Sequence, residues 1–286
     1  MLKKIFVISL PAAVLLFSCN NNHDKKTGGD QPETPIERRT QISYRLLSPK
    51  DSIRKIVRSS DSTALEVISA VNRADKNALV NFDTIVIPAD TKQTNEQYFP
   101  FPFNAAFLKD VNKIIFFSYP AQSFAAYEHG RLVYTGPTSM GRNTDPTPTG
   151  LFYTNWKAEK STSTFNDEWD LKWNFNIENK LGIGFHEYSM PGYPASHSCL
   201  RLKEKDAMYL YNWADQWKIE GTDNILTHGT PVIIFGSYPF GRSRPWLGMA
   251  QNPDILIISE TDLENIGKQY LPDIMEKQSE RSKEEK

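Results

Sequence analysis

The chain has 286 residues, of which 39% are hydrophobic and 23% charged, and its net charge is -1. This composition is ordinary for a soluble globular protein with room for one sizeable domain and a smaller one. No basic stripe stands out, so nucleic acid is excluded as an expected partner. The aromatic content of 12% allows aromatic-lined grooves for sugars or peptides, although aromatic side chains also fill cores.

The first residues read as a targeting segment rather than as part of a fold. Lys3 and Lys4 precede an apolar run over 5–17, which is too short to span a bilayer as a stable helix. The run ends in Leu16-Phe17-Ser18-Cys19, which resembles the lipobox of bacterial lipoproteins. The resemblance implies a signal peptide over 1–18 and lipidation of Cys19, with the protein held to a membrane of the cell envelope and facing the periplasm. A plain secretory signal cleaved nearby is the alternative.

The chain has two cysteines, Cys19 and Cys199. If Cys19 carries lipid, Cys199 has no partner for an internal disulfide. A free thiol is a liability in an exported protein, and this favours a reactive role for Cys199. The chain also has five histidines, but no paired ligand spacing accompanies them, so no metal site and no cofactor are expected.

Two segments precede the main domain. Residues 19–40 are expected to be a disordered tether, because 20–40 contain one large aliphatic residue, Ile36. Residues 42–90 predict a strand at 42–47, two helices with apolar residues at helical spacing, and a closing strand at 83–88. This order, with the runs 50–53, 71–73 and 83–88, resembles a LysM module, which implies binding to N-acetylglucosamine polymers such as peptidoglycan. A structural extension of the main domain is the alternative.

From Lys113 onward the sequence is rich in short apolar runs. They predict strands at 114–119, 123–127, 131–134, 151–154, 183–185 and 231–236, with a hairpin turn at Glu128-His129-Gly130. One amphipathic helix is expected over 206–217. We therefore expect a mainly β (α+β) domain over 110–237 that is a sandwich or barrel-like sheet.

Two further segments have weaker patterns. The insert over 155–180 contains Trp156, Trp169 and Trp173, which would either line a substrate lid or pack in the core. Residues 238–286 are expected to be a C-terminal extension that is partly helical or disordered, because eight of the last twelve residues are charged.

The residues that suggest chemistry lie around Cys199, in the run Ser196-His197-Ser198-Cys199-Leu200-Arg201-Leu202. A free thiol has a pKa near ~8.5, so a catalytic cysteine needs an imidazole or another base at neutral pH. His197 lies two residues before Cys199 and His186 thirteen residues before it. Arg201 would add positive charge or bind a substrate carboxylate.

Four blocks of sequence carry a resemblance to one family. They are 136–141, 146–152, Phe185-His186-Glu187 with 191–202, and 230–234, in this order along the chain. Together they are similar to the YkuD-type L,D-transpeptidases over about residues 112–236. The resemblance implies a mostly β fold and a cysteine enzyme that acts on peptidoglycan.

The family implies a role for each matching residue. Cys199 would attack the peptide bond after the third residue of a stem peptide, release D-alanine and form a thioester. An amine from another stem would then give a 3→3 cross-link. His186 is the preferred base, oriented by a carbonyl or side chain near Glu187, and His197 shapes the site or shares that role. Substrate contacts and the oxyanion hole would involve Ser196, Ser198, Arg201, Gly192 and the backbone N–H groups of 197–199.

The sequence departs from the family pattern at the residue just before Cys199. The family usually has glycine where this chain has Ser198, and serine would be strained there by about 1–3 kcal/mol if the position needs a positive φ. This leaves open a weakened or inactive enzyme.

Other functions also stay open. If water resolves the thioester, the enzyme is an L,D-carboxypeptidase, and a non-catalytic cell-wall-binding lipoprotein is a third possibility. An NlpC/P60-type peptidase is disfavoured, because both candidate histidines precede the cysteine. The expected partners are peptidoglycan stem peptides and glycan, with the protein itself a monomer.

Overall fold

The computed structural model describes residues 39–162, 170–222 and 224–285. The predicted signal peptide over 1–18, the lipidation site Cys19 and the tether up to residue 38 lie outside the described residues, as does Trp169. Within the described ranges, no helix is long and apolar enough to cross a membrane.

Residues 42–90 form the predicted strand–helix–helix–strand order with one short additional helix. The elements are β1 (Tyr44–Leu47), α1 (Lys50–Ser59), α2 (Ser62–Val71), α3 (Lys76–Leu79) and β2 (Ile85–Pro88). β1 pairs antiparallel with β2. The buried amide of Asn72 joins helix to sheet, because its Nδ2 donates to the carbonyls of Ile68 and Val86 while its Oδ1 accepts from the Val86 N–H. We call residues 42–90 the N-terminal module.

The main domain is a two-sheet β sandwich, which confirms the predicted mainly β class. Two short 3-10 helices, η1 (Asn95–Tyr98) and η2 (Ala106–Leu108), lead into it. The five-stranded sheet has the order β5-β4-β3-β13-β6 and the four-stranded sheet the order β10-β9-β8-β7. Their bounds are β3 (Lys113–Ser118), β4 (Ser123–Glu128), β5 (Arg131–Pro137), β6 (Gly150–Tyr153), β7 (Lys157–Thr162), β8 (Asp170–Glu178), β9 (Ile183–Glu187), β10 (Leu200–Leu202) and β13 (Pro231–Phe235).

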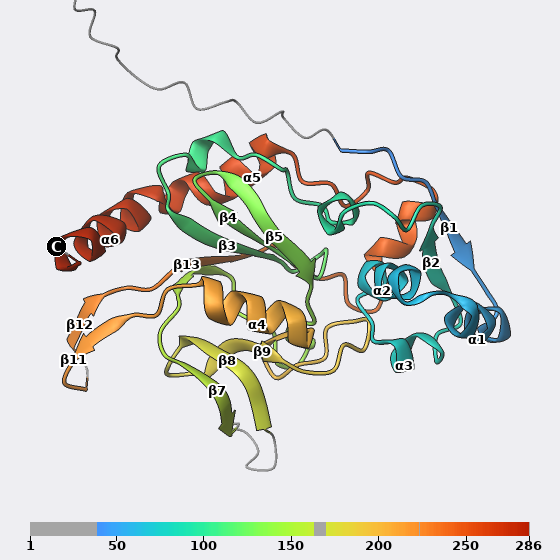
Figure 1. Ribbon diagram of the computed structural model, residues 1–286, viewed down its shortest axis with the longest axis horizontal. Coiled ribbons are helices and arrows are strands. Elements are labelled where there is room, and N and C mark those ends of the chain that lie inside the picture. Colours follow the sequence, from blue (N-terminus) through green and yellow to red (C-terminus); the bar gives the residue numbers. More distant parts are fainter. Residues whose placement is uncertain (1–38, 163–169, 223, 286) are drawn as a thin grey trace, which may run out of the picture. The chain divides into compact units, whose positions relative to one another are not determined.

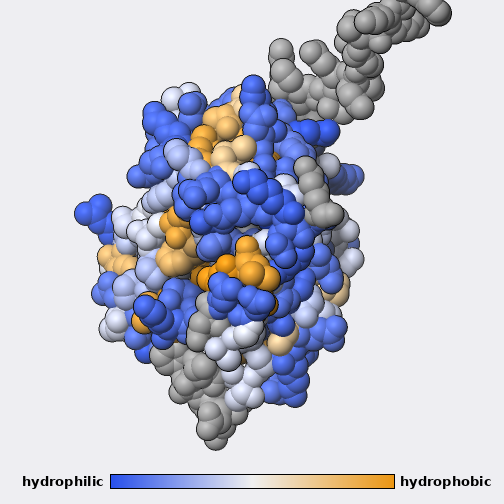
Figure 2. Space-filling view, turned by 90° about the vertical axis from the view of Figure 1, so that its left-hand side faces the viewer, coloured by the Kyte–Doolittle hydropathy of each residue, from blue (hydrophilic) through white to orange (hydrophobic). Residues whose placement is uncertain are grey.

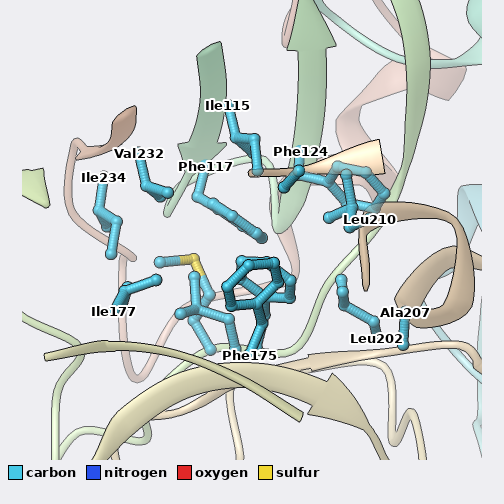
Figure 3. Packing of buried hydrophobic residues seen from close by; sticks show 14 of the residues in the cluster. Ile115, Phe117, Phe124, Phe175, Ile177, Leu202, Ala207, Leu210, Val232 and Ile234 are labelled. Carbon is cyan, nitrogen blue, oxygen red and sulfur yellow. The ribbon is translucent and has the colours of Figure 1, made fainter. Parts of the chain in front are cut away.

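Alternation along β3 places its side chains in two different cores. Ile115 and Phe117 face the four-stranded sheet, where they meet Phe175 of β8 and neighbouring side chains (Figure 3). The helix α4 (Glu204–Trp213) closes this inner core with Ala207 and Leu210. The predicted helix over 206–217 therefore exists but begins two residues earlier and ends at Trp213.

The C-terminal extension covers the outer face of the five-stranded sheet (Figure 1). It contains η3 (Pro245–Ala250), α5 (Glu260–Gly267), η4 (Lys268–Tyr270) and α6 (Leu271–Glu284). Leu263 of α5 and Ile274 of α6 pack against Ile114 and Phe116, the outward-facing residues of β3. The extension was expected to be partly helical or disordered, and its described part contains two α-helices whose apolar residues join a core.

Two hairpins were not predicted from the sequence. The insert over 155–180 contains β7 and β8, with Trp173 packed partly against the inner core and Trp156 exposed. The second hairpin, β11 (Lys218–Glu220) with β12 (Asn224–Thr227), lies at the left of Figure 1. Figure 2 views the molecule from that side, where hydrophobic patches interrupt a mainly hydrophilic surface.

Arg73 joins the N-terminal module to the rest of the protein. Its guanidinium is buried, its Nε donates to the Ala121 carbonyl at 2.9 Å, and it lies over the rings of Phe99 and Trp246 at 5.5 and 5.0 Å. Burial lowers the pKa of Arg73 to about 10, so it remains a cation at neutral pH. A buried cation needs such partners, and they come from the sandwich, from the segment between the N-terminal module and β3, and from the C-terminal extension.

Candidate active site

The parallel pairing of β9 and β10 brings the two best sequence candidates together. Leu200 is the register partner of Phe185, and Arg201 is the partner of His186. Phe185 and Leu200 point into the inner core, so His186, Arg201 and the preceding Cys199 lie on the opposite face. The strand pairing thus places Cys199 and His186, which are thirteen residues apart in the sequence, on the same face of the sheet.

The imidazole of His186 is held as a neutral base. The side chain is 4% exposed, and its Nδ1 lies 2.8 Å from the carbonyl oxygen of Glu187. Because a carbonyl only accepts, Nδ1 carries the hydrogen and Nε2 keeps its lone pair. Burial lowers the pKa of His186 to about 4, and nearby Arg201 acts in the same direction. The predicted orienting carbonyl near Glu187 is confirmed as that of Glu187 itself.

The Cys199 thiol keeps some solvent exposure and has no disulfide partner among the described residues. Its Sγ lies 3.8 Å from the Gly182 carbonyl oxygen. Burial raises the pKa of the thiol, while a backbone hydrogen bond at Gly184 and the charge of Arg201 act in the opposite direction. Burial therefore favours a protonated Cys199 thiol and a neutral His186 imidazole.

Arg201 and His197 lie two residues after and two residues before Cys199, and their surroundings differ. The guanidinium of Arg201 lies 4.4 Å above the ring of Tyr188, a cation–π contact that fixes its position. Burial lowers the pKa of Arg201. His197 is partly exposed and lies near Asp145, whose pKa is lowered first by its hydrogen bond with Arg142 and also by the charge of His197.

The segment 139–147 supports the loop that carries Cys199. Ser139 and Arg201 exchange both backbone hydrogen bonds at 3.0 Å, and the Met140 carbonyl accepts from the N–H groups of Ala195 and Ser196. The hydroxyl of Ser196, which is buried, donates to the Cys199 carbonyl. We call residues 188–199 the catalytic loop. Its irregular backbone is stable because these bonds satisfy its polar groups.

Ser198 adopts the conformation that makes serine costly. Its φ is +76°, in the left-handed region that glycine enters freely. The side chain compensates, since its hydroxyl donates toward the carbonyls of Asp145 and Pro146, each at 3.2 Å. Thr147 adds a bridge, as its hydroxyl accepts from the Gly141 N–H and donates to the Ser198 carbonyl, both at 2.8 Å.

The N-terminal module supports the catalytic loop from the other side. The Asp75 N–H donates to the Met190 carbonyl at 2.8 Å, and the Met190 N–H donates to the Asp75 carboxylate at 2.7 Å. Gly192 is buried with a φ of +85°, and a Cβ there would lie 2.5 Å from the ring of Phe82. The close approach explains the glycine, while a substrate contact at Gly192 stays a prediction.

Several residues that position the site were missed in the sequence. Thr147 lies in a block that was recognised, but its bridging role depends on a segment about fifty residues away. Asp75 and Phe82 belong to a module with no sequence signal for contact with the catalytic loop. Within the described ranges, no three His, Cys, Asp or Glu side chains are grouped so as to hold a metal ion.

Comparison with known families identifies the domain that contains this site. Residues 112–234 match the YkuD family model, described as the L,D-transpeptidase catalytic domain. The match includes Cys199, His186 and the segment 139–147, and it confirms the predicted catalytic domain. It covers less than half of the 286 residues. No curated protein matches the chain.

Solved structures similar to this chain include L,D-transpeptidases from several bacteria. One from Stackebrandtia nassauensis is 19% identical, with 52% of this chain and 63% of that chain covered and a TM-score of 0.38. One from Mycobacterium smegmatis is 19% identical, with 44% and 59% covered and a TM-score of 0.35. L,D-transpeptidase 1 from Mycobacterium tuberculosis is 19% identical, with 44% and 62% covered and a TM-score of 0.34. The chain thus spans less than two thirds of each, and likenesses this distant carry no argument about activity.

Substitutions at Ser198 test whether its hydroxyl offsets backbone strain. Ser198→Ala keeps a Cβ at φ +76° but loses both hydroxyl contacts, so we expect it to lower the free energy of unfolding by about 1 kcal/mol. Ser198→Gly loses the same contacts and the strain together, so its stability should stay within about 1 kcal/mol of the wild type. Urea unfolding measures both. An alanine variant as stable as the wild type would contradict the compensation.

The buried neutral His186 predicts acid sensitivity. Its folded pKa of about 4 lies below the unfolded value of 6.5, so the unfolded state binds more protons between these values and stability falls as the pH drops through this window. Relative to His186→Gln, the wild type should lose about 3 kcal/mol of unfolding free energy between pH 7 and pH 4. Urea unfolding across this range measures the difference. His129→Asn, at an exposed turn position, is the control and should leave the wild-type slope unchanged.

Proposed function

We propose that this protein is a peptidoglycan L,D-transpeptidase that forms 3→3 cross-links through a thioester on Cys199. The observation that carries the proposal is the placement of Cys199 and His186 on one face of paired strands inside the matched catalytic domain, with His186 Nε2 left as an acceptor. A nucleophile and a neutral base oriented by a third group are the parts that acyl transfer needs.

The resting protonation states suggest how the thiol is activated. With the pKa of Cys199 raised and that of His186 lowered, the proton stays on sulfur until the substrate is in place. As sulfur attacks the carbonyl carbon of the third stem residue, the thiol proton passes to Nε2. The imidazolium then donates it to the departing amine of D-alanine, and the carbonyl re-forms as the thioester. Backbone N–H groups of 197–199 would stabilise the oxyanion.

The second half of the reaction decides between two products. Attack on the thioester by an amine of another stem gives the cross-link and returns the proton to sulfur through His186. Attack by water gives a shortened stem, the L,D-carboxypeptidase outcome. A weak enzyme that mainly binds the cell wall is the third candidate, and the φ of +76° at Ser198 is the observation that favours it.

Replacing the nucleophile tests the reaction. Cys199→Ala should lower turnover of stem peptides by on the order of 10⁴-fold or more, because no other group forms the acyl-enzyme. Muropeptide analysis of peptidoglycan treated with wild type or variant gives the readout. Met208→Leu, at an exposed position of α4, is the control and should behave as the wild type. Equal yields of 3→3 dimers and shortened stems from wild type and Cys199→Ala would eliminate the mechanism.

The remaining predictions concern where the enzyme works. We propose that lipid on Cys19 holds it to a membrane and that the N-terminal module binds peptidoglycan glycan, as its LysM-like order implies. A tether of about twenty residues has a typical reach of roughly 25 Å, which would let the domain work on a polymer near the membrane.

Fractionation of cells tests the anchor. Cys19→Ser should move the protein from the membrane fraction to the soluble fraction, because acyl chains supply the attachment. Lys92→Ser, at an exposed position between the module and the sandwich, is the control and should stay in the membrane fraction. The anchor is wrong if Cys19→Ser remains membrane-bound.

A further inference from the structure

A pocket lies where the N-terminal module, the catalytic loop and the C-terminal extension meet. It is lined by residues 81–84 of the module, by Tyr193 and Pro194 of the catalytic loop, and by residues of the extension between 238 and 244. Its volume is about 500 Å³, within the usual range of small-ligand sites. Apart from Tyr193 and Pro194, the lining lies outside the matched family segment 112–234, so this pocket is built by the parts added to the catalytic domain.

Aromatic side chains form much of its wall. Phe82 comes from the module, Tyr193 from the catalytic loop, and Tyr238 and Phe240 from the extension. Tyr193 is 50% exposed, and the rings of Tyr238 and Phe240 meet edge-on at 5.1 Å. Such walls suit a ligand that has apolar surface together with polar groups.

The charged groups of the pocket favour an anion. Arg242 is exposed, while Arg244 lies 3.9 Å over the Phe82 ring and donates through Nη2 to the Thr84 carbonyl, so its guanidinium is held in place. Nη1 of Arg244 is covered and has no acceptor among the described residues. Asp83 is the acidic side chain of the lining, and it is paired with Lys50 at 3.4 Å. The two guanidinium groups of the lining outnumber its one carboxylate, and this net positive charge suits a carboxylate ligand.

The pocket lies within reach of the nucleophile. Pro194 and Cys199 are five residues apart, so their Cα atoms are at most roughly 17 Å apart even in fully extended chain. The three stem residues before the scissile bond span roughly 10 Å in extended form, and their side chains extend further. A stem peptide with its scissile bond at Cys199 can therefore approach the pocket with a part that is remote from that bond.

We propose that this pocket is a binding site for a carboxylate-bearing part of a peptidoglycan stem peptide, remote from the bond that reacts. The proposal rests on the proposed function and adds a determinant of substrate choice to it. Arg242 binds the carboxylate, the fixed guanidinium of Arg244 adds positive charge beside it, and the aromatic wall packs against the peptide's apolar surface. The N-terminal module and the extension thus take part in recognising the peptide as well as in supporting the catalytic loop.

Calorimetric binding to the whole chain carrying Cys199→Ala tests the site without turnover. The probes are a synthetic stem tetrapeptide with free carboxylates and the same peptide with its carboxylates amidated. Adding Arg242→Gln should weaken binding of the free-acid peptide by about tenfold or more, the usual effect of losing a charge-assisted hydrogen bond. Arg45→Gln, an exposed arginine of β1 outside the pocket, is the matched control and should leave the affinity unchanged.

The amidated peptide completes the test. It should bind with the same affinity whether or not the protein carries Arg242→Gln, and more weakly than the free acid binds the protein that keeps Arg242. Equal binding of both peptides, or an affinity for the free acid that does not change with Arg242→Gln, would overturn the site. Because Arg242 is exposed, its replacement is not expected to disturb folding, and thermal unfolding verifies this.

Failure of this site and failure of the proposed function give different results. If Arg242-dependent binding of the free acid is present but cross-linking does not depend on Cys199, the pocket stands and the transpeptidase proposal falls. If cross-linking depends on Cys199 but binding ignores Arg242, the transpeptidase stands and the pocket falls.

Discussion

Parallel pairing of β10 with β9 is the interaction on which the rest of the site depends. Because paired residues of parallel strands share a face, the register of Arg201 with His186 turns both side chains away from the inner core. Cys199, just before β10, faces the same way. The buried partners Phe185 and Leu200 favour this register, since a slip by one residue would turn their apolar side chains out of the inner core.

The three-residue strand β10 is too short to hold the catalytic loop in place by itself. The loop is supported by hydrogen bonds from two other parts of the protein. The Met140 carbonyl accepts from Ala195 and Ser196 in its later part, and Asp75 binds Met190 at its beginning. Ser139 binds Arg201, just after the loop, through two backbone hydrogen bonds. One support lies inside the catalytic domain and the other in the N-terminal module. The module is therefore part of the architecture of the site, and Arg73 shows the same integration at a second point, where its buried charge is shared with the sandwich and the extension.

The electrostatics follow from burial. Burial of the imidazole lowers the pKa of His186, although the hydrogen bond to the Glu187 carbonyl acts in the opposite direction. Burial likewise raises the pKa of the Cys199 thiol. Arg201 influences both groups, since it lowers the pKa of the imidazole and opposes the rise of the thiol's pKa.

The sequence by itself indicated the mainly β class, the β3–β4–β5 strands and the resemblance of about residues 112–236 to the YkuD family, because local apolar patterns and motif spacing record them directly. It also identified Ser198 as an unusual residue, but only the tertiary structure gave its φ and the two carbonyls that its hydroxyl meets. The contacts of Asp75, Phe82 and Thr147 were decided in the same way. Each joins segments about fifty to more than a hundred residues apart, and no local pattern encodes which distant backbone group will lie opposite a side chain. The same holds for the charged helix α6. Its few apolar residues contribute to a core only because they pack against the outer face of the five-stranded sheet.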